Sequence, residues 1–278
     1  MQRTMELIEA REARLYLQKR DLLRHVYDLH ELSEEFPYPV TIYANYIKDA
    51  DELGCMMTVH HRDEYLEVRF FADTVDDFRA CLHAVPTVVP AVDKGKPLVF
   101  VVDAAWMVDP VAEEFGCELV GRSLFYAYTK KRIGVPSSSV RMLGADDLPV
   151  IQQFIAKYTP RMPGNHPARL DNVIKSGDSR LFGWIEDGAL IAYVVVTRVD
   201  IGPESRDQIW DITHIWTEPS HHGSGLAEET LAVSTAWILG HGGYPYYSGV
   251  AVGNRESQKA CENIGFELVG EKWMLAKL

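Results

Sequence analysis

An internal repeat constrains the fold of this 278-residue chain more than any other feature of its sequence. The segment Gly116-Cys117-Glu118-Leu119-Val120-Gly121 returns as Gly265-Phe266-Glu267-Leu268-Val269-Gly270, at an offset of 149 positions. Three further identities fall at the same offset: Val101 with Val250, Glu113 with Glu262, and Ala127 with Ala276. In both copies a strand pattern and a helix pattern precede the segment and a strand pattern follows it, which indicates a duplicated domain.

Hydrophobic periodicity predicts strands and helices in both copies, and hence an α/β fold in which helices cover a mixed sheet. In the first copy we expect one long helix from about Met5 to Leu32, ended by the prolines of Phe36-Pro37-Tyr38-Pro39. Further elements are expected at 40–46, 56–60, 65–71, 75–83, 98–102, 109–115 and 119–128. In the second copy they are expected at 140–143, 146–158, 168–175, 181–185, 190–199, 208–217, 225–239, 246–252, 255–264 and 266–276.

The segment between the two copies has the composition of a linker. It reads KKRIGVPSSS over residues 130–139, with a basic run, a glycine, a proline and three serines. We therefore expect an N-terminal domain over residues 1–132, a linker over 133–139 and a C-terminal domain over 140–278.

Charge and cysteine content exclude several classes of protein. The net charge is −12, which argues against nucleic-acid binding because that function needs a concentrated basic surface. No cysteine pair has C-x₂-C spacing and the histidines lack metal-ligand spacing, so we expect no metal site. The N-terminus has no apolar signal segment, and no apolar run approaches the ~18–20 residues of a membrane span, so we expect a cytoplasmic protein that does not bind membranes.

A glycine loop between a predicted strand and a predicted helix is the most informative motif for function. It reads Pro219-Ser220-His221-His222-Gly223-Ser224-Gly225-Leu226-Ala227. A helix N-terminus presents unpaired N–H groups and the positive end of the helix dipole, and glycines let a phosphate approach those amides closely. The alternative is a strand-to-helix turn that uses glycine for its geometry alone.

The context of this loop resembles the GNAT superfamily of acyl-CoA-dependent N-acyltransferases. The family's phosphate loop is Arg/Gln-x-x-Gly-x-Gly/Ala with a proline three residues upstream, and the stretch from His222 to Ala227 matches it with Pro219 in place. A later signature of the family, an Asn followed by a helix that ends in Gly-Phe, is matched by Asn254 and Gly265-Phe266. The resemblance covers residues 140–278, and the ending NRESQKACENIGFELVGE is most similar to the glycine N-acyltransferase-like branch. It implies tandem GNAT-like domains, of which the C-terminal one carries the acyl-CoA site and the N-terminal one is degenerate.

Three departures from the family pattern bear on function. His222 stands where the family has a basic or amide residue, which makes one phosphate contact weaker or pH-dependent. Cys261 stands where many members have a tyrosine that protonates the departing thiolate, and its thiol is the candidate substitute for that acid. In the first copy the counterpart of the loop, residues 73–78, has no glycine and has acids where phosphate would lie, so we expect no CoA binding there.

The resemblance implies roles for the residues around the loop. Pantetheine would pair with the backbone of Ile215, Trp216 and Thr217, in a V-shaped gap between the strands at 208–217 and 246–252. The amides of Gly223, Ser224, Gly225, Leu226 and Ala227 would bind the pyrophosphate. Asn254 either binds the pantetheine arm or caps a helix, because Asn favours that position.

Candidates for the general base and for a residue that binds the amine substrate lie near the gap. Attack on a thioester needs a neutral amine, so a base is useful. His214 ranks before Asp211 as the candidate, and their separation of three places them on opposite faces of a regular strand. Glu218 is a third candidate. By resemblance the loop at 158–167 lines the acceptor site, where Arg161 is a candidate for binding a substrate carboxylate.

The predicted function is therefore transfer of an acyl group, most simply acetyl from acetyl-CoA, to a primary amine of a small molecule by direct attack. Two alternatives stay open at this point, a CoA-binding protein without turnover and a protein N-acetyltransferase. A homodimer is compatible with the long N-terminal helix.

Overall fold

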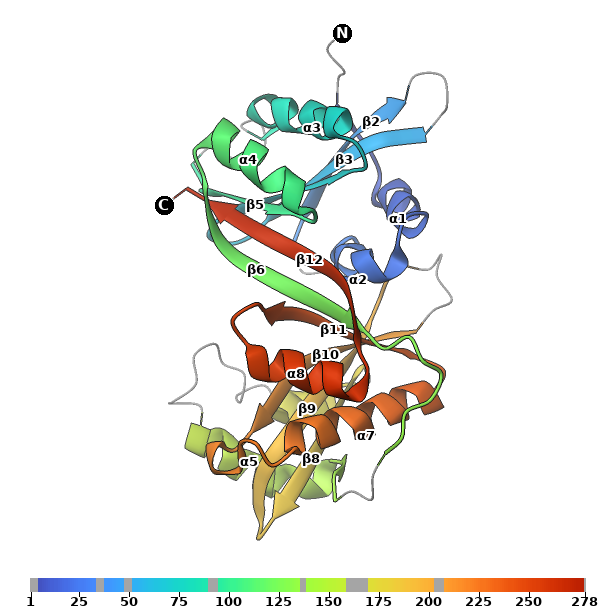
Figure 1. Cartoon of the computed structure of the whole chain (residues 1–278), viewed down its shortest axis with the longest axis vertical. Helices are drawn as coiled ribbons and strands as arrows, with labels where there is room; N and C mark the ends of the chain where they lie inside the picture. Colours follow the sequence, from blue (N-terminus) through green and yellow to red (C-terminus); the bar gives the residue numbers. More distant parts are fainter. Residues whose placement is uncertain are drawn as a thin grey trace. The chain divides into compact units, whose positions relative to one another are not determined.

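The computed structural model describes residues 5–33, 38–47, 52–89, 95–135, 139–158, 170–202 and 208–277. The first copy of the repeat forms, in order, β1 (Glu6–Leu7), α1 (Ala10–Gln18), α2 (Leu22–Glu31), β2 (Val40–Ile47), β3 (Glu52–His61), β4 (Leu66–Ala72), α3 (Val75–Val88), β5 (Leu98–Val102), α4 (Val108–Phe115) and β6 (Glu118–Ala127) (Figure 1).

The second copy repeats this order of elements. It forms β7 (Arg141–Met142), α5 (Leu148–Tyr158), α6 (Leu170–Lys175), β8 (Ser179–Glu186), β9 (Ala189–Val199), β10 (Ile209–Thr217), α7 (Leu226–Gly240), β11 (Tyr244–Ala251), α8 (Arg255–Ile264) and β12 (Glu267–Ala276). Because strand and helix follow one another in the same sequence in both copies, the architecture agrees with the duplication that the sequence repeat indicates.

The chain forms two compact units that are not consecutive in sequence. Unit 1 comprises Met1–Leu124, Asp200–Ser205 and Gly270–Leu278, and unit 2 comprises Phe125–Val199 and Arg206–Val269. The division falls within β6 and β12, so each of these strands contributes residues to both units. The expected boundaries at 1–132, 133–139 and 140–278 describe consecutive segments and stay a prediction.

Unit 1 differs from the sequence prediction at its N-terminus. The single helix expected from Met5 to Leu32 was wrong, because a short strand precedes two separate helices, α1 and α2. The break occurs at Asp21, whose Oδ1 accepts hydrogen bonds from the N–H groups of Leu23 and Arg24 and so begins a new helix.

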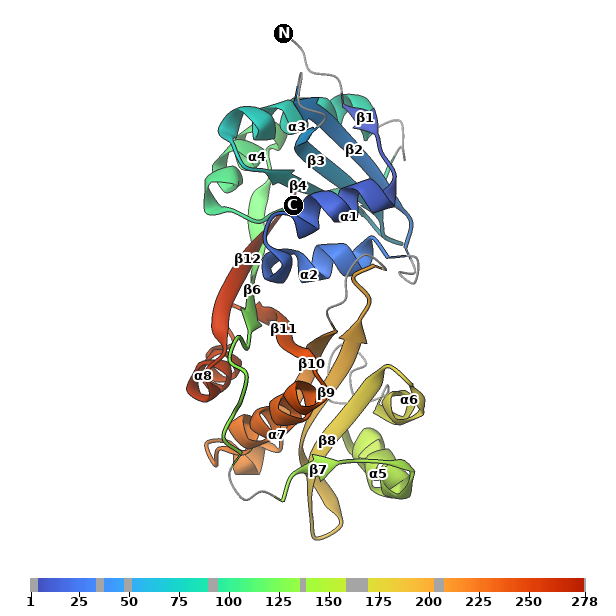
Figure 2. The same ribbon diagram turned by 90° about the vertical axis from the view of Figure 1, so that its right-hand side faces the viewer.

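The two faces of the sheet in unit 1 have different chemistry. α3 and α4 cover an apolar face, where Phe70, Phe78 and Phe100 pack together. α2 covers the other face with buried charges: Asp28 contacts Arg69 and Lys272, and Glu31 contacts Arg69. Figure 2 shows α1 and α2 together on their side of these strands.

Unit 2 has helices on both faces of its sheet (Figure 2). α5 and α6 pack over β8 and β9 around Phe154, Leu181 and Tyr193. On the opposite face Leu226 of α7 packs against Ile191 and Ala192. β7 to β10 pair in antiparallel order, and β10 then pairs in parallel with β11.

Candidate functional site

The site begins where β10 and β11 separate. Their parallel pairing covers only the stretch in which Ile209, Trp210 and Asp211 face Tyr244, Pro245 and Tyr246, although β10 continues to Thr217 and β11 to Ala251. The last paired residue, Asp211, is 7% exposed. Its Oδ1 accepts a hydrogen bond from Ser248 N–H at 2.9 Å, and its Oδ2 accepts one from Ser248 Oγ at 2.6 Å. Asp211 therefore ties the two strands together at the point of divergence.

A β-bulge in β10 changes which residues share a face. Ile212 lies opposite Val196 of β9 and His214 lies opposite Val195, so one extra residue, Thr213, is inserted. Asp211 and His214 consequently lie on the same face of the sheet, the face that α5 and α6 cover. The expectation of opposite faces was wrong, because it assumed a regular strand.

Beyond the bulge, Ile215 and Trp216 again alternate between the two faces. Trp216 packs against Phe154 and Tyr158 of α5, with ring centroids 4.7 and 4.9 Å apart. Ile215 lies opposite Val194 and belongs to the face that α7 covers. The strand thus presents His214 toward one layer of helices and Ile215 toward the other.

The glycine loop leads from β10 into α7. It contains a short 3₁₀ turn at Pro219–His221, followed by Gly223 and Gly225, whose φ angles are +79° and +84°. A Cβ at either glycine would meet no atom within 4 Å, so the left-handed backbone conformation and not lack of space requires glycine. The first intrahelical bond runs from Glu229 N–H to Gly225 O, so the N–H groups of Leu226, Ala227 and Glu228 have no acceptor within the helix. The N–H of Ser224 donates to the carbonyl oxygen of His221 at 3.2 Å.

Side chains of the loop hold its own backbone. His222 Nε2 lies 3.1 Å from the carbonyl oxygen of Thr217, which requires Nε2 to carry the hydrogen. Ser224 Oγ donates to the carbonyl oxygen of His221 at 2.6 Å. In the neutral ring of His222, Nδ1 is then an acceptor, and it donates to an anion only when the ring is protonated.

A groove of about 540 Å³ runs from the end of β10 past the glycine loop to α8. The sequence-predicted residues that line it are Ile215, Trp216, Thr217, His222, Gly223, Gly225, Leu226, Ala227 and Asn254. Asn254 also caps α8, since its Oδ1 accepts from Ser257 N–H at 3.1 Å. α8 adds five residues to the lining: Glu256, Ser257, Lys259, Ala260 and Asn263. Sequence reasoning missed these five, because only the geometry of the groove distinguishes them from other helical residues.

Cys261 lies apart from the groove. Its side chain is fully buried in α8, and the lining passes from Ala260 to Asn263 without it. Burial raises the pKa of the Cys261 thiol to about 12, and the nearby Glu262 carboxylate adds to this. The thiol is therefore a protonated packing group at neutral pH.

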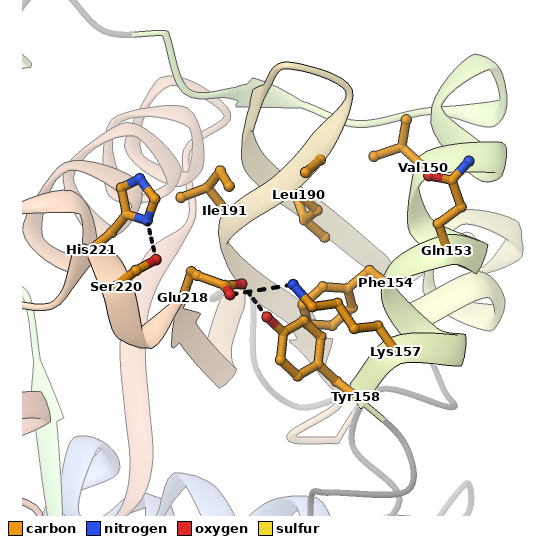
Figure 3. Close-up of a pocket in the computed structure, with 11 residues that line it drawn as sticks. Val150, Gln153, Phe154, Lys157, Tyr158, Leu190, Ile191, Glu218, Ser220 and His221 are labelled. Carbon is orange, nitrogen blue, oxygen red and sulfur yellow. Dashed lines mark hydrogen bonds and ion pairs between the residues drawn. The ribbon is translucent and has the colours of Figure 1, made fainter.

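A smaller pocket of about 200 Å³ opens on the α5 side of the sheet (Figure 3). Glu218 lies at its centre, where one carboxylate oxygen accepts from Tyr158 Oη and the other from Lys157 Nζ at 3.3 Å. Burial, followed by the hydrogen bond to Glu218, raises the pKa of Tyr158. Two donors thus already occupy the Glu218 carboxylate. His221 lines both this pocket and the groove.

Two further expectations concern other parts of the chain. Arg161, the candidate for a substrate carboxylate, lies outside the described residues. In the first copy, Thr74 caps α3 by accepting from Asp77 N–H at 3.2 Å, and Asp76 and Asp77 occupy the first turn. A helix start with its own cap and two acids is unfavourable for a phosphate.

The described residues contain no group of three or more His, Cys, Asp or Glu side chains that could hold a metal ion. None of the helices that these residues form is both long and apolar enough to span a membrane.

Comparison with known proteins shows which family the part of the chain around this site resembles. Residues 150–266 match the acetyltransferase (GNAT) family. These residues contain β10, the glycine loop, α7 and α8, and hence the whole groove. The match covers less than half of the chain, so it shows that this part of the chain is similar to the GNAT acetyltransferases. A comparison with curated proteins finds no match.

Solved structures share the fold over nearly the whole chain. A Drosophila protein is 15% identical, covers 99% of each chain and has a TM-score of 0.62. An acetyltransferase of the GNAT family from Colwellia psychrerythraea is 15% identical, covers 98% of each chain and has a TM-score of 0.63. A tandem GNAT protein from the clavulanic acid biosynthesis pathway is 10% identical, covers 99% of this chain and 98% of its own, and has a TM-score of 0.56. At these identities the similarity concerns the fold alone.

Proposed function

We propose that the chain transfers an acyl group, most simply acetyl, from acyl-CoA to a primary amine of a small molecule, and that the groove of unit 2 binds the acyl-CoA. The observation that carries this proposal is the continuity of the groove from the unpaired stretch of β10 to the start of α7. Pantetheine is a chain of amides that can pair with a free strand edge, and a pyrophosphate suits the amides at Gly223–Ala227.

The proposed reaction is a direct displacement. The amine nitrogen forms a bond to the thioester carbonyl carbon, and the bond from that carbon to sulfur breaks. One proton leaves the amine and one is taken up by the CoA thiolate, so the products are an amide and free CoA. Backbone N–H groups of β10 are suited to stabilise the negative charge that develops on the carbonyl oxygen.

We assign the proton acceptor to His214. It follows the bulge, is half-buried, and lies on the α5 side of β10. Asp211 lies on the same face, but both of its oxygens already accept hydrogen bonds from Ser248. Asp211 is therefore a positioning residue that fixes the separation of β10 and β11, and an imidazole is the better general base near neutral pH.

The experiment that tests this proposal measures release of free thiol from acetyl-CoA in the presence of a panel of primary amines, with the acetylated amine identified by mass. Lysine-rich and N-terminal peptides form the second arm of the panel. Acetylation of small amines alone supports the proposal, and acetylation of peptides alone would make the protein a protein N-acetyltransferase instead.

The burial of Cys261 favours a second candidate function, a CoA-binding protein without turnover. In this alternative the groove binds acyl-CoA, but no acid reaches the sulfur, because the thiol at the family's tyrosine position is buried and protonated. Saturable binding of acetyl-CoA without thiol release across the whole panel would support it. The weak basicity of a thiolate, whose conjugate acid has a pKa of about 8.5, lets water supply this proton, so we place the enzyme first.

A further inference from the structure

The pocket on the α5 side of the sheet has no role in the proposed reaction, although it lies in the same unit as the groove. Among the described residues that line them, the pocket and the groove share only His221. On the α5 face of β10 and the residue that follows it, Trp216 stands between His214 and Glu218. The ring of Trp216 packs against α5 and does not line the pocket. The pocket is therefore separate from the proposed site of acyl transfer.

The pocket already holds an ammonium group, which belongs to the chain itself. Lys157 reaches from α5 to Glu218, and its Nζ lies 3.3 Å from one carboxylate oxygen (Figure 3). The same Nζ lies 4.7 Å from the centroid of the Tyr158 ring, within the range of a cation–π interaction. The hydroxyl of Tyr158 donates to the other carboxylate oxygen of Glu218. A carboxylate and an aromatic ring thus converge on one positive charge.

The contact between Lys157 and Glu218 is loose and open to solvent. The side chain of Lys157 is 55% exposed, whereas that of Glu218 is 19% exposed. A well-formed hydrogen bond from an ammonium to a carboxylate is about 2.7–2.9 Å long, so the distance of 3.3 Å leaves room for a closer donor. Because an exposed ion pair contributes little free energy, another ammonium can replace that of Lys157 at small cost.

The walls of the pocket determine what kind of molecule would carry this ammonium. Four apolar side chains line it: Val150, Phe154, Leu190 and Ile191. Such walls gain free energy when they pack against an alkyl chain. The volume of about 200 Å³ suits a short chain rather than a large ring system. The net charge of −12 also favours the approach of a cation.

The two polar residues that follow Glu218 in the pocket bind each other. Ser220 Oγ lies 3.0 Å from His221 Nδ1, and His221 Nε2 lies 3.4 Å from a carboxylate oxygen of Glu186. These contacts occupy both nitrogens of the ring. Glu218 is therefore the residue of the pocket that would select the charge of a ligand.

We propose that this pocket is a second ligand site of unit 2 and that it takes a small aliphatic primary amine. The ammonium group binds between the carboxylate of Glu218 and the ring of Tyr158, and the alkyl chain packs against Phe154 and Leu190. Lys157 occupies the ammonium position when the pocket holds no amine. The inference goes beyond the proposed function, because an amine bound here is separated from His214 and is not the one that is acylated.

The test measures the binding of n-butylammonium to the full chain by titration calorimetry, without CoA or acyl-CoA. We expect saturable binding to the wild type. Lys157→Ala removes the competing ammonium and should bind the probe about tenfold more tightly. Glu218→Gln keeps an acceptor for the Tyr158 hydroxyl but loses the charge, and it should bind the probe about tenfold more weakly. n-Butanol, which has the same alkyl chain without a charge, should bind the wild type about tenfold more weakly than n-butylammonium.

The matched control removes a lysine from another exposed ion pair of unit 2. Lys175 pairs with Asp171 at 3.5 Å and does not line the pocket, so Lys175→Ala should bind n-butylammonium as the wild type does. Misfolding cannot imitate the gain of affinity expected for Lys157→Ala. An unchanged or lost affinity in Lys157→Ala, an unchanged affinity in Glu218→Gln, or equal affinities for butanol and butylammonium would overturn the inference. Because acyl-CoA is absent, none of these outcomes depends on whether the chain transfers an acyl group.

Discussion

Replacement of Asp211 should mainly lower the stability of the protein, whereas replacement of His214 should mainly lower the rate of acyl transfer. Each oxygen of Asp211 accepts one hydrogen bond from Ser248, at 2.9 and 2.6 Å, in an environment where Asp211 is 7% exposed. A hydrogen bond to a charged group contributes about 1.5–3 kcal/mol. Asp211→Ala also removes the cost of burying a carboxylate, so we expect a net loss of about 2–4 kcal/mol in the free energy of unfolding.

Asp211→Asn keeps both contacts in neutral form, because the amide oxygen accepts from Ser248 N–H and the amide nitrogen donates to Ser248 Oγ. We expect it to cost about 1 kcal/mol of stability and to lower the rate of acyl transfer less than tenfold. His214 is half-buried, so His214→Gln should change stability by less than about 1 kcal/mol. Because His214→Gln loses the general base, its rate of acyl transfer should fall about 10²–10⁴-fold.

The assay combines urea unfolding with the thiol-release rate at saturating acetyl-CoA and amine. His241→Gln serves as the matched control. His241 is exposed at the end of α7, and within the described residues its side chain forms a hydrogen bond only with a backbone carbonyl oxygen. The reasoning is refuted if Asp211→Asn loses a hundredfold or more in rate at unchanged stability while His214→Gln keeps its rate. That outcome would make Asp211 the base.

Three further predictions concern buried groups. Cys261→Ala should keep CoA affinity and lower turnover less than tenfold, because the thiol lies outside the groove and burial raises its pKa to about 12. A hundredfold loss of turnover with intact CoA binding would contradict this. Lys272→Ala should lower the stability of unit 1 by about 3 kcal/mol in urea unfolding, because it removes one partner of the buried Asp28 pair, and a loss below about 1 kcal/mol would count against a structural role. Burial alone would raise the pKa of Asp28, but Lys272, His25 and Arg69 hold this pKa well below its usual value. The stability that ionised Asp28 gives to the folded state is therefore complete above about pH 4 and is lost as the pH falls further. The urea midpoint of unit 1 should therefore fall between pH 6 and pH 3, and an unchanged midpoint would show that the buried charges contribute no net stability.

Local signals explain why much of the fold could be predicted. α8 was predicted at its observed bounds, because Asn254 caps its start and Gly265 ends it at φ +100°. The glycine loop also had a local signal, because Gly223 and Gly225 occupy positions with positive φ angles that favour glycine. The helix break at Asp21 also had a local signal in its capping side chain, but the apolar periodicity continues through it and concealed the break.

The features that could not be predicted depend on contacts between distant segments. The bulge at Thr213 is defined by the register of β10 against β9, and nothing in the neighbouring residues marks it. The contact of Asp211 with Ser248 joins residues 37 positions apart. The residues of α8 that line the groove follow from how α8 packs beside α7. For these reasons the loop of the candidate site was located from sequence, whereas the arrangement of its polar groups was not.

The central claim is that the groove of unit 2 binds acyl-CoA through the start of α7, and titration calorimetry with acetyl-CoA tests it most directly. Gly225→Glu places a side chain and a negative charge at the proposed phosphate position. Gly242→Glu is the matched control, because Gly242 follows the other end of α7, has a φ of +75°, and has equally open space around its Cβ position. We predict one site per chain in the wild type and in Gly242→Glu, and no binding in Gly225→Glu, with all three folded by circular dichroism. Undiminished binding in Gly225→Glu, or two equivalent sites per chain in the wild type, would contradict the account.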